Sequence, residues 1–355
     1  MKLRMSHKER VLASFNFEEP DRIPIDIAFR SEPWTKLKSY LGTDDDEKVF
    51  RWCGGDFRVI GMNPPEGWRP TLHPDGTFED EWGIRRKIGS TGLYEHFHYY
   101  HPLADAEDLS NYEFPDPSDS TRWQTANEIM KKYGEEYAML GANATTLFEI
   151  SWQLRGFKKF LRDLYINSKF ANQLLDKLTD IRIEMGLIMI EIGVDIMFLG
   201  DDVGMQTGML LPPHIWKKHF KPRMQKIIYA YRSKKSDIII DYHSDGDITA
   251  IVPDLIEIGV NVLNPVQPDC MDPVKIKNEY GDRLAIRGAI SVQETMPFGS
   301  PEEVKSVVIE RIKTLAPGGG FAIAPSHVIP PETPVENIVT LYKTAQKYGF
   351  YPMRS

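Results

Sequence analysis

Cysteine is scarce in this sequence, with two residues, Cys53 and Cys270, in a chain of 355. Two thiols are too few for a framework of disulfide bonds, and they fit a reducing compartment. Long apolar runs are lacking too: none reaches the roughly 18 residues of a membrane span. The first residues, MKLRMSHKERVLASF, contain no apolar run of signal-peptide length. These absences predict a cytoplasmic protein with no membrane partner.

An excess of positive charge is also lacking. The chain has 43 Lys and Arg against 51 Asp and Glu, which gives a formal net charge of -8. Nucleic-acid binding without sequence preference needs a basic face, so we expect no nucleic-acid partner. The three glycines at 318–320 precede a strand-like run and therefore do not form a dinucleotide fingerprint. The sequence contains no P-loop and no nucleophile elbow either.

Apolar strand-like runs alternate regularly with helical patterns along most of the chain. The predicted strands are 23–28, 57–62, 137–142, 194–200, 237–242, 260–264, 283–288 and 321–325. The predicted helices are 5–16, 147–163, 169–192, 212–232, 247–259, 272–279, 300–316 and 333–349. This alternation indicates βαβ units and a parallel sheet. Eight strands predict a single (β/α)₈ TIM-type barrel over residues 1–355, with an N-terminal helical extension. An open, doubly wound sheet is the alternative.

An insertion interrupts this pattern at about residues 62–123. Asp75 and Gly76 form a turn signal, and the aromatic pieces near 84–99 partly alternate in polarity. Such pieces favour antiparallel strands or hairpins. Residues 103–123 are rich in Asp, Pro and Ser and predict a connecting loop.

Polar residues follow the predicted strands, where a barrel of this kind keeps its active site. The candidates are Arg30, Asn143, Asp201, Asp202, His243, Asp245, Gln267, Arg287, Ser326 and His327. Imidazole and carboxylate together suit a divalent metal such as zinc, and without metal they suit acid–base chemistry. Each residue also has a structural interpretation: His243 as a hydrogen-bonded histidine, Asp245 as a helix cap, and His327 as a loop residue. One of Asp201 and Asp202 fits turn chemistry.

Several longer motifs resemble the uroporphyrinogen decarboxylase superfamily. They are ERVLASFNFEEPDRIPI, VDIMFLGDDVGMQ, YHSDGD, LNPVQPDCMDP and GGFAIAPSHVIPPETPVENI, in the order typical of the superfamily and over nearly the whole chain. The resemblance implies a barrel and one of two chemistries. One is cofactor-free decarboxylation of tetrapyrrole acetate groups, and the other is zinc-assisted methyl transfer to or from a corrinoid protein.

The details of the motifs separate the two branches. Decarboxylases resemble one another in an Arg-rich motif after the first strand, whereas AFRSEPW here contains Arg30 alone. An octa-anionic substrate needs several cations, so this departure argues against uroporphyrinogen decarboxylation. Thiol-methylating relatives hold zinc through His-x-Cys and a later Cys, and the matching positions here are His243, Asp245 and His327. The resemblance therefore implies a harder zinc or other divalent-metal site made of these three residues.

The leading hypothesis is a corrinoid-dependent methyltransferase, with methylcobalamin supplied on a separate corrinoid-binding protein. It moves a methyl group to or from a small-molecule donor or acceptor. Asp201 or Asp202 is expected to complete the metal shell or orient the substrate, and Arg30 to hold an anionic group. The predicted substrate-binding residues are Asn143, Gln267, Arg287 and Ser326. The alternatives are a metal-free decarboxylase, in which Arg30 and Arg287 bind a carboxylate, and a non-catalytic small-molecule-binding barrel.

Overall fold

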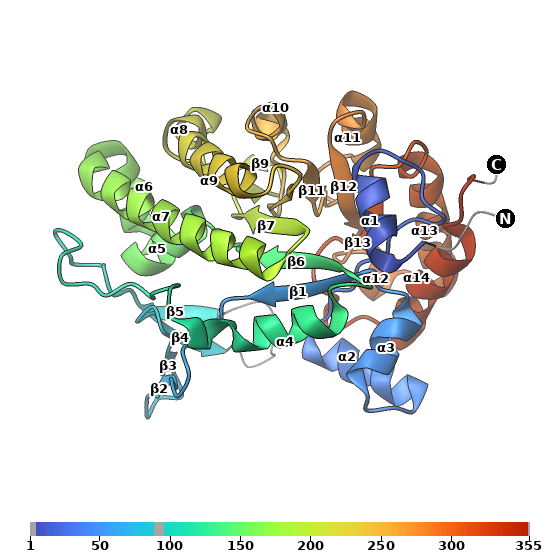
Figure 1. Ribbon diagram of the computed structural model, residues 1–355, viewed down its shortest axis with the longest axis horizontal. Helices are drawn as coiled ribbons and strands as arrows, with labels where there is room; N and C mark the ends of the chain where they lie inside the picture. The colour runs from blue at the N-terminus through green and yellow to red at the C-terminus, as the bar shows by residue number, and fades with distance from the viewer. Residues whose placement is uncertain (1–4, 89–95, 354–355) are drawn as a thin grey trace.

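Seven parallel strands form one curled sheet in the computed structural model of the chain, which describes residues 5–88 and 96–353. In sheet order they are β1 (Phe57–Gly61), β6 (Ala138–Ala142), β7 (Ile196–Gly200), β10 (Ile239–His243), β11 (Val262–Asn264), β12 (Ala285–Ile290) and β13 (Phe321–Pro325). Helices flank this sheet along the outside (Figure 1). Each strand is connected to the one before it in the sheet by a crossover that contains at least one helix, which is why all of them run parallel.

Residues 23–29 fill the position between β13 and β1. Ile25 pairs in parallel with Ile323 of β13, and Phe29 pairs with Ile329 just beyond it. On the other side, the Asp56 amide donates to the Ile25 carbonyl at 2.9 Å. Residues 23–29, the closing segment, thus link the two ends of the sheet, and the predicted TIM-type barrel is confirmed.

Helices occupy the crossovers and the N-terminal extension. The α-helices are α1 (His7–Phe15), α2 (Ser31–Leu41), α3 (Asp46–Cys53), α4 (Gln124–Tyr133), α5 (Phe148–Arg155), α6 (Phe157–Ile166), α7 (Ser168–Ile192), α8 (Pro213–His219), α9 (Lys221–Lys234), α10 (Val252–Glu257), α11 (Pro273–Tyr280), α12 (Thr295–Phe298), α13 (Pro301–Leu315) and α14 (Val335–Tyr348). Two short 3₁₀ helices, η1 (Ser120–Trp123) and η2 (Thr249–Ile251), precede α4 and α10. Among the described residues, no helix combines the length and the apolar character that crossing a membrane requires.

Two predicted helices are each divided in the structure. The helix expected over 147–163 breaks at Gly156, whose φ of 87° is a backbone conformation that ends α5. The helix expected over 212–232 consists of α8 and α9, which meet at Phe220. Pro222 stands in the first turn of α9, where its missing N–H is tolerated, so the chain restarts a helix there.

The insertion after β1 forms the expected antiparallel structure. Its four strands pair in the order β2 (Thr71–Leu72), β3 (Phe78–Glu79), β4 (Arg85–Ile88) and β5 (His96–Tyr100). In the view of Figure 1 these strands lie opposite the two chain termini, on the side toward which β1 points. A small hairpin of β8 (Gly204–Met205) and β9 (Gly208–Met209) follows β7. Both features belong to the end of the barrel where the strands finish.

The barrel interior has its own apolar core, separate from the shell between sheet and helices. The side chains of this inner core are Val11, Phe15, Phe57, Ala138, Leu140, Ile196, Ile239, Val262, Ala285 and Ala322. Val11 and Phe15 come from α1, and the others come from the strands. The N-terminal extension therefore closes the amino end of the barrel, and any open space lies toward the carboxyl end.

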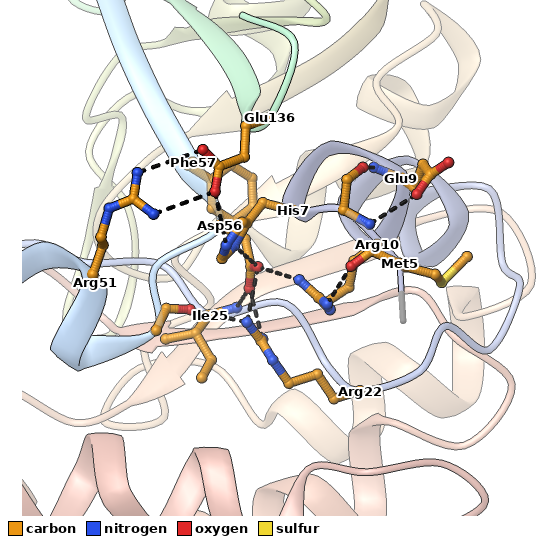
Figure 2. Close-up of polar contacts among 12 residues, drawn as sticks. Met5, His7, Glu9, Arg10, Arg22, Ile25, Arg51, Asp56, Phe57 and Glu136 are labelled. Carbon is orange, nitrogen blue, oxygen red and sulfur yellow. Dashed lines mark hydrogen bonds and ion pairs between the residues drawn. The ribbon is translucent and has the colours of Figure 1, made fainter. Parts of the chain in front are cut away.

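A buried carboxylate, Asp56, fixes this closure (Figure 2). Its side chain has no exposed surface and accepts hydrogen bonds from Arg10, Arg22, His7 and the Ile25 amide, each at 2.7 Å. Burial raises the pKa of the Asp56 carboxyl, but His7, Arg22 and Arg10 outweigh this effect and hold the pKa below its ordinary value. The cluster joins α1, the closing segment and β1.

Candidate functional site

Acidic and imidazole side chains meet at the carboxyl ends of β7, β10 and β13. His243 Nε2 lies 3.5 Å from Asp202 Oδ1 and 3.7 Å from Asp245 Oδ1. His327 Nε2 lies 3.8 Å from Asp245 Oδ2, and the two imidazole rings are 6.3 Å apart between centroids. The chain thus brings together residues that are up to 125 positions apart in sequence because parallel strands end at one edge.

Asn264, the last residue of β11, sets the orientation of His243. Its amide nitrogen donates to the Arg287 carbonyl at 2.7 Å, so its Oδ1 is left to accept. The His243 Nδ1 lies 2.6 Å from that oxygen and therefore carries the proton. The other ring nitrogen, Nε2, then presents its lone pair toward Asp202 and Asp245.

The separations between the side-chain atoms of this cluster are compatible with a metal site. Ligand atoms about 2.1 Å from a tetrahedral ion stand roughly 3.4 Å apart, close to the separations around His243 Nε2. Asp202, His243 and Asp245 can each offer one ligand atom, all within 4.8 Å of one another. Asp245 Oδ1 is buried and has no hydrogen-bond partner among the described residues. The donor set fits a divalent ion that accepts both nitrogen and oxygen, such as zinc.

An inner cavity of about 440 Å³ lies inside the barrel, beneath the cluster. Its walls are mainly apolar, and its polar lining residues are Asp26, Thr145, Glu149, Asp202, His243, Asn264, Arg287 and His327. The lining residues come from the closing segment and from all seven strands of the parallel sheet. It can enclose a small molecule in direct contact with Asp202 and His243.

An outer cavity of about 590 Å³ borders the same cluster from the other side. Its lining includes Arg30, Asp245, Gln267 and Phe298, and the ring of Phe298 is 77% exposed. Asp202 and His327 line both cavities. The cluster therefore stands between two spaces, and a group bound in one of them can reach a group bound in the other.

Burial strongly alters the acidity of the groups here. It raises the pKa of Asp245 to about 7, with Asp202 adding to the rise and His243 opposing it. Burial, followed by the nearby Asp202 and Asp201, raises the pKa of Glu149 to about 9. Burial and the neighbouring His243 lower the pKa of His327 to about 4. Carboxyl groups crowded in this way are stabilised by a cation placed among them.

Three of the predicted site residues are engaged elsewhere. Asp201 is buried and accepts the amide protons of Leu147 and Glu149, so it anchors the start of α5. The side chain of Asn143 is bonded to α7 and α9 through Arg182 and the Tyr231 hydroxyl. Ser326 is also buried, and its hydroxyl accepts the Val292 amide. None of the three lines either cavity.

The remaining predicted residues do reach the site. Arg30 and Gln267 line the outer cavity, where Gln267 Oε1 also accepts the Gly246 amide at 2.7 Å. Arg287 lines the inner cavity. Its guanidinium is bonded to two carboxylates, Asp241 and Asp26. Of the predicted metal ligands, His243 and Asp245 form a group with Asp202 in which the possible ligand atoms all lie within 4.8 Å of one another. His327 is outside this group, with its Nε2 3.8 Å from Asp245 Oδ2.

Four further residues lie at the site and were not predicted from the sequence: Asp26, Glu149, Asp241 and Asn264. Asp26 and Asp241 each interrupt an apolar strand, and a charge inside such a run is a detectable signal of an interior polar site. Asn264 was hidden because it ends a strand rather than following one. Glu149 belongs to a helix, α5, and its sequence neighbourhood has no distinguishing pattern.

Comparison with known proteins adds the evolutionary context. The sequence model of the uroporphyrinogen decarboxylase (URO-D) family matches residues 97–348. The chain belongs to the uroporphyrinogen decarboxylase family. This match extends from the insertion to the last helix and so includes the carboxyl ends of β7, β10 and β13.

The curated proteins to which this chain is similar include both methyltransferases and decarboxylases. A methylcobamide:CoM methyltransferase MtaA of Methanosarcina barkeri is 26% identical over 220 residues, 62% of this chain and 61% of that protein. A uroporphyrinogen decarboxylase of Chloroherpeton thalassium is 26% identical over 237 residues, 64% of each chain. The chain thus spans about three fifths of the length of these curated relatives.

A solved structure supports the fold over nearly the whole chain. The methyltransferase from Methanosarcina mazei superposes with a TM-score of 0.71 and 20% sequence identity. The alignment covers 97% of this chain and 99% of the other. At this identity the likeness establishes the shared barrel, and the chemistry has to be argued from the site.

Proposed function

We propose that this protein is a metal-assisted methyltransferase of the URO-D family. It transfers a methyl group between a small methylated molecule in the inner cavity and a corrinoid carried by a separate protein. The observation that carries the proposal is the oriented cluster of Asp202, His243 and Asp245 between two cavities. The names of the methyltransferase relatives support the same reaction class.

The residues of the cluster could hold the metal that assists methyl transfer. Asp202, His243 and Asp245 would hold a divalent metal, and His327 stands close enough to complete the set. A metal bound there supplies a Lewis acid for the heteroatom that loses or gains the methyl group. His243 keeps its Nε2 directed at this point through Asn264, and the apolar walls of the inner cavity exclude water around the methyl group.

The two cavities give each reactant its own approach. The inner cavity is enclosed by the barrel and suits the small molecule, whereas the outer one has the exposed Phe298 at its border. A corrinoid presented by another protein would enter from this outer side. The cluster would then lie between donor and acceptor, as a direct transfer demands.

The decarboxylase alternative receives less support from the inner cavity. A substrate with several carboxylates needs several unengaged cations. Among the described residues that line this cavity, Arg287 is the one Lys or Arg, and two carboxylates already bind it.

The test is a direct assay of both reactions with purified protein. We expect stoichiometric divalent metal in the purified protein. We also expect transfer of a methyl group from one of a panel of methyl ethers, thioethers and amines to free cob(I)alamin, which a chemical reductant keeps as Co(I), and the change in cobalamin absorbance measures this transfer. His243→Ala and Asp202→Ala should lose the metal and the activity, whereas the control His214→Ala on α8 should keep both. Conversion of uroporphyrinogen by wild type, with no metal bound, would refute the proposal.

A further inference from the structure

We propose that the inner cavity selects an uncharged methyl ether with one aromatic ring and rejects anionic methylated compounds. This inference rests on the proposed function, because it names the substrate class of that site. It is carried by the composition of the cavity walls and by the charges of the layer at the cavity floor.

The walls are apolar and partly open to a ligand. Val59, in the middle of β1, lines the cavity, and 54% of its surface is exposed. Its neighbours in the lining include Phe57, Leu140 and Phe198. A half-exposed apolar side chain inside a barrel gains free energy when an apolar ligand covers it. An aromatic ring matches this wall.

The floor is an ion-pair layer that crosses the barrel. Arg287 Nε contacts Asp241 Oδ2 at 2.5 Å, and Arg287 Nη1 contacts Asp26 Oδ2 at 2.5 Å. The three residues come from β12, β10 and the closing segment. Asp241 and His243 are two positions apart on β10, so the layer lies roughly 6–7 Å below the metal cluster.

The charge of this layer is negative, because two carboxylates share one guanidinium. The other ionisable groups that line the cavity are Glu149, Asp202, His243 and His327, and none of them is a permanent cation. A divalent ion held by Asp202, His243 and Asp245 would be balanced by the two carboxylates of that set and would leave the negative charge of the floor in place. A carboxylate ligand at the floor would therefore be buried beside Asp26, next to a guanidinium whose charge Asp26 and Asp241 already neutralise. Such burial of an uncompensated charge is strongly disfavoured.

An uncharged ether avoids this cost and still interacts with the cluster. The ether oxygen has a lone pair that can interact with a metal held by Asp202, His243 and Asp245. A quaternary ammonium has no such lone pair. At the floor, Arg287 Nη2 is buried and has no hydrogen-bond partner among the described residues. This nitrogen is a donor for a neutral acceptor such as a phenolic oxygen.

The experiment measures binding, and it needs neither corrinoid nor turnover. Calorimetric titration of the full-length protein compares 4-methoxyphenol, 4-methoxybenzoate and 4-methoxy-N,N,N-trimethylanilinium at neutral pH. We expect 4-methoxyphenol to bind, and the anion and the cation to bind at least ~10-fold more weakly, equal to about 1.4 kcal/mol. Tighter binding of either charged compound, or no binding of 4-methoxyphenol, would overturn the inference.

Two variants locate the selectivity in this cavity. Val59→Trp fills the open wall and should abolish binding of 4-methoxyphenol. Asp26→Asn removes one of the two ion pairs of Arg287. It should strengthen the binding of 4-methoxybenzoate relative to that of 4-methoxyphenol by at least ~10-fold. Asp163→Asn, which breaks a comparable buried pair with Arg155, should leave the preference unchanged.

These results separate the inference from the proposed function. If 4-methoxyphenol binds as expected but no methyl reaches a corrinoid from any donor, the proposed function fails and the binding class stands. If methyl transfer occurs only from anionic donors, the function stands and the binding class is wrong. Unchanged binding in Val59→Trp would place the ligand outside the inner cavity and contradict the inference.

Discussion

At the scale of single residues, the orientation of His243 depends on Asn264. The Asn264 side chain is itself fixed by the Arg287 carbonyl, so a chain of hydrogen bonds runs from β12 through β11 to the ring on β10. Partners of this kind set the tautomer of a ligating histidine and strengthen its binding of metal.

We therefore expect Asn264→Ala to weaken binding of zinc or cobalt by roughly 10- to 100-fold. A competition titration with a coloured chelator measures this change. The matched control is Asn337→Ala, which removes another buried asparagine with two backbone hydrogen bonds, far from the cluster. Equal metal affinity in the two variants would show that Asn264 does not orient the ligand.

At the scale of elements, the close contact of β7 with β10 holds the site together. Gly200 ends β7 with a φ of 141°, and a Cβ there would lie 2.0 Å from the His243 carbonyl oxygen. The two strands can meet at this point only because Gly200 has no side chain. The strand ends that carry Asp202 and His243 are thus placed by a glycine.

We expect Gly200→Ala to displace the end of β10 and to reduce metal affinity by at least ~10-fold, since the ligands must lie within a few tenths of an ångström. Gly208→Ala is the control, because Gly208 has a similar φ of 144° and open space around it. A metal titration that gives the same loss for both variants would attribute the effect to backbone strain and not to the contact.

The attachment of α1 is a second property of the elements. The Asp56 carboxylate balances the positive charges of Arg10 and Arg22 inside the protein, and it is the one described carboxylate that contacts the Arg22 guanidinium. Asp56→Asn would leave buried positive charge, and we expect a loss of about 3–5 kcal/mol in the free energy of unfolding. Urea denaturation measures this value, with Asp237→Asn on the surface as the control.

The effect of Asp56 should also depend on pH. The pKa of this carboxyl is lowered by folding, so its stabilisation is complete above the ordinary Asp value of about 3.9 and is lost as the pH falls toward the lower folded value. The difference between wild type and Asp56→Asn should therefore be constant near neutral pH and shrink below about pH 4. A difference that grows in acid would contradict this assignment.

At the scale of the whole molecule, the proposed metal ligands come from three strand ends, so metal binding should be coupled to folding. An ion that binds the native state alone, at 100 times its Kd, adds about 2.7 kcal/mol to the free energy of unfolding. We expect zinc or cobalt to raise the thermal midpoint of wild type, but not that of an Asp202→Ala and His243→Ala double variant. An equal rise in both proteins, measured by circular dichroism, would place the metal elsewhere.

The two ends of the barrel have separate tasks. The amino end is closed by α1 and the Asp56 cluster, and the carboxyl end carries the proposed metal ligands between two cavities. Stability and the proposed chemistry thus depend on different residues, as in other barrels of this class. Substitutions at Asp56 should lower stability with little effect on metal affinity.

The sequence by itself determined the order of strands and helices, and so the barrel. Its apolar runs have the lengths of strands and helices, and periodicity is a local property that the chain carries everywhere. It also determined which strand ends carry His243, Asp245 and His327, because the site of a barrel lies after its strands. The insertion and its antiparallel character followed from turn signals and alternation.

Only the tertiary structure decided which of these polar residues meet. Asp201 and Asp202 are adjacent, yet one anchors α5 and the other faces both cavities. From the sequence, Arg287 is expected to bind a substrate carboxylate. In the structure its guanidinium is instead bonded to the protein's own carboxylates, Asp26 and Asp241. The physical reason is that a side chain's role depends on the direction in which it points and on the partners it finds there. Both are fixed by strand register and barrel closure, which join residues distant in the sequence.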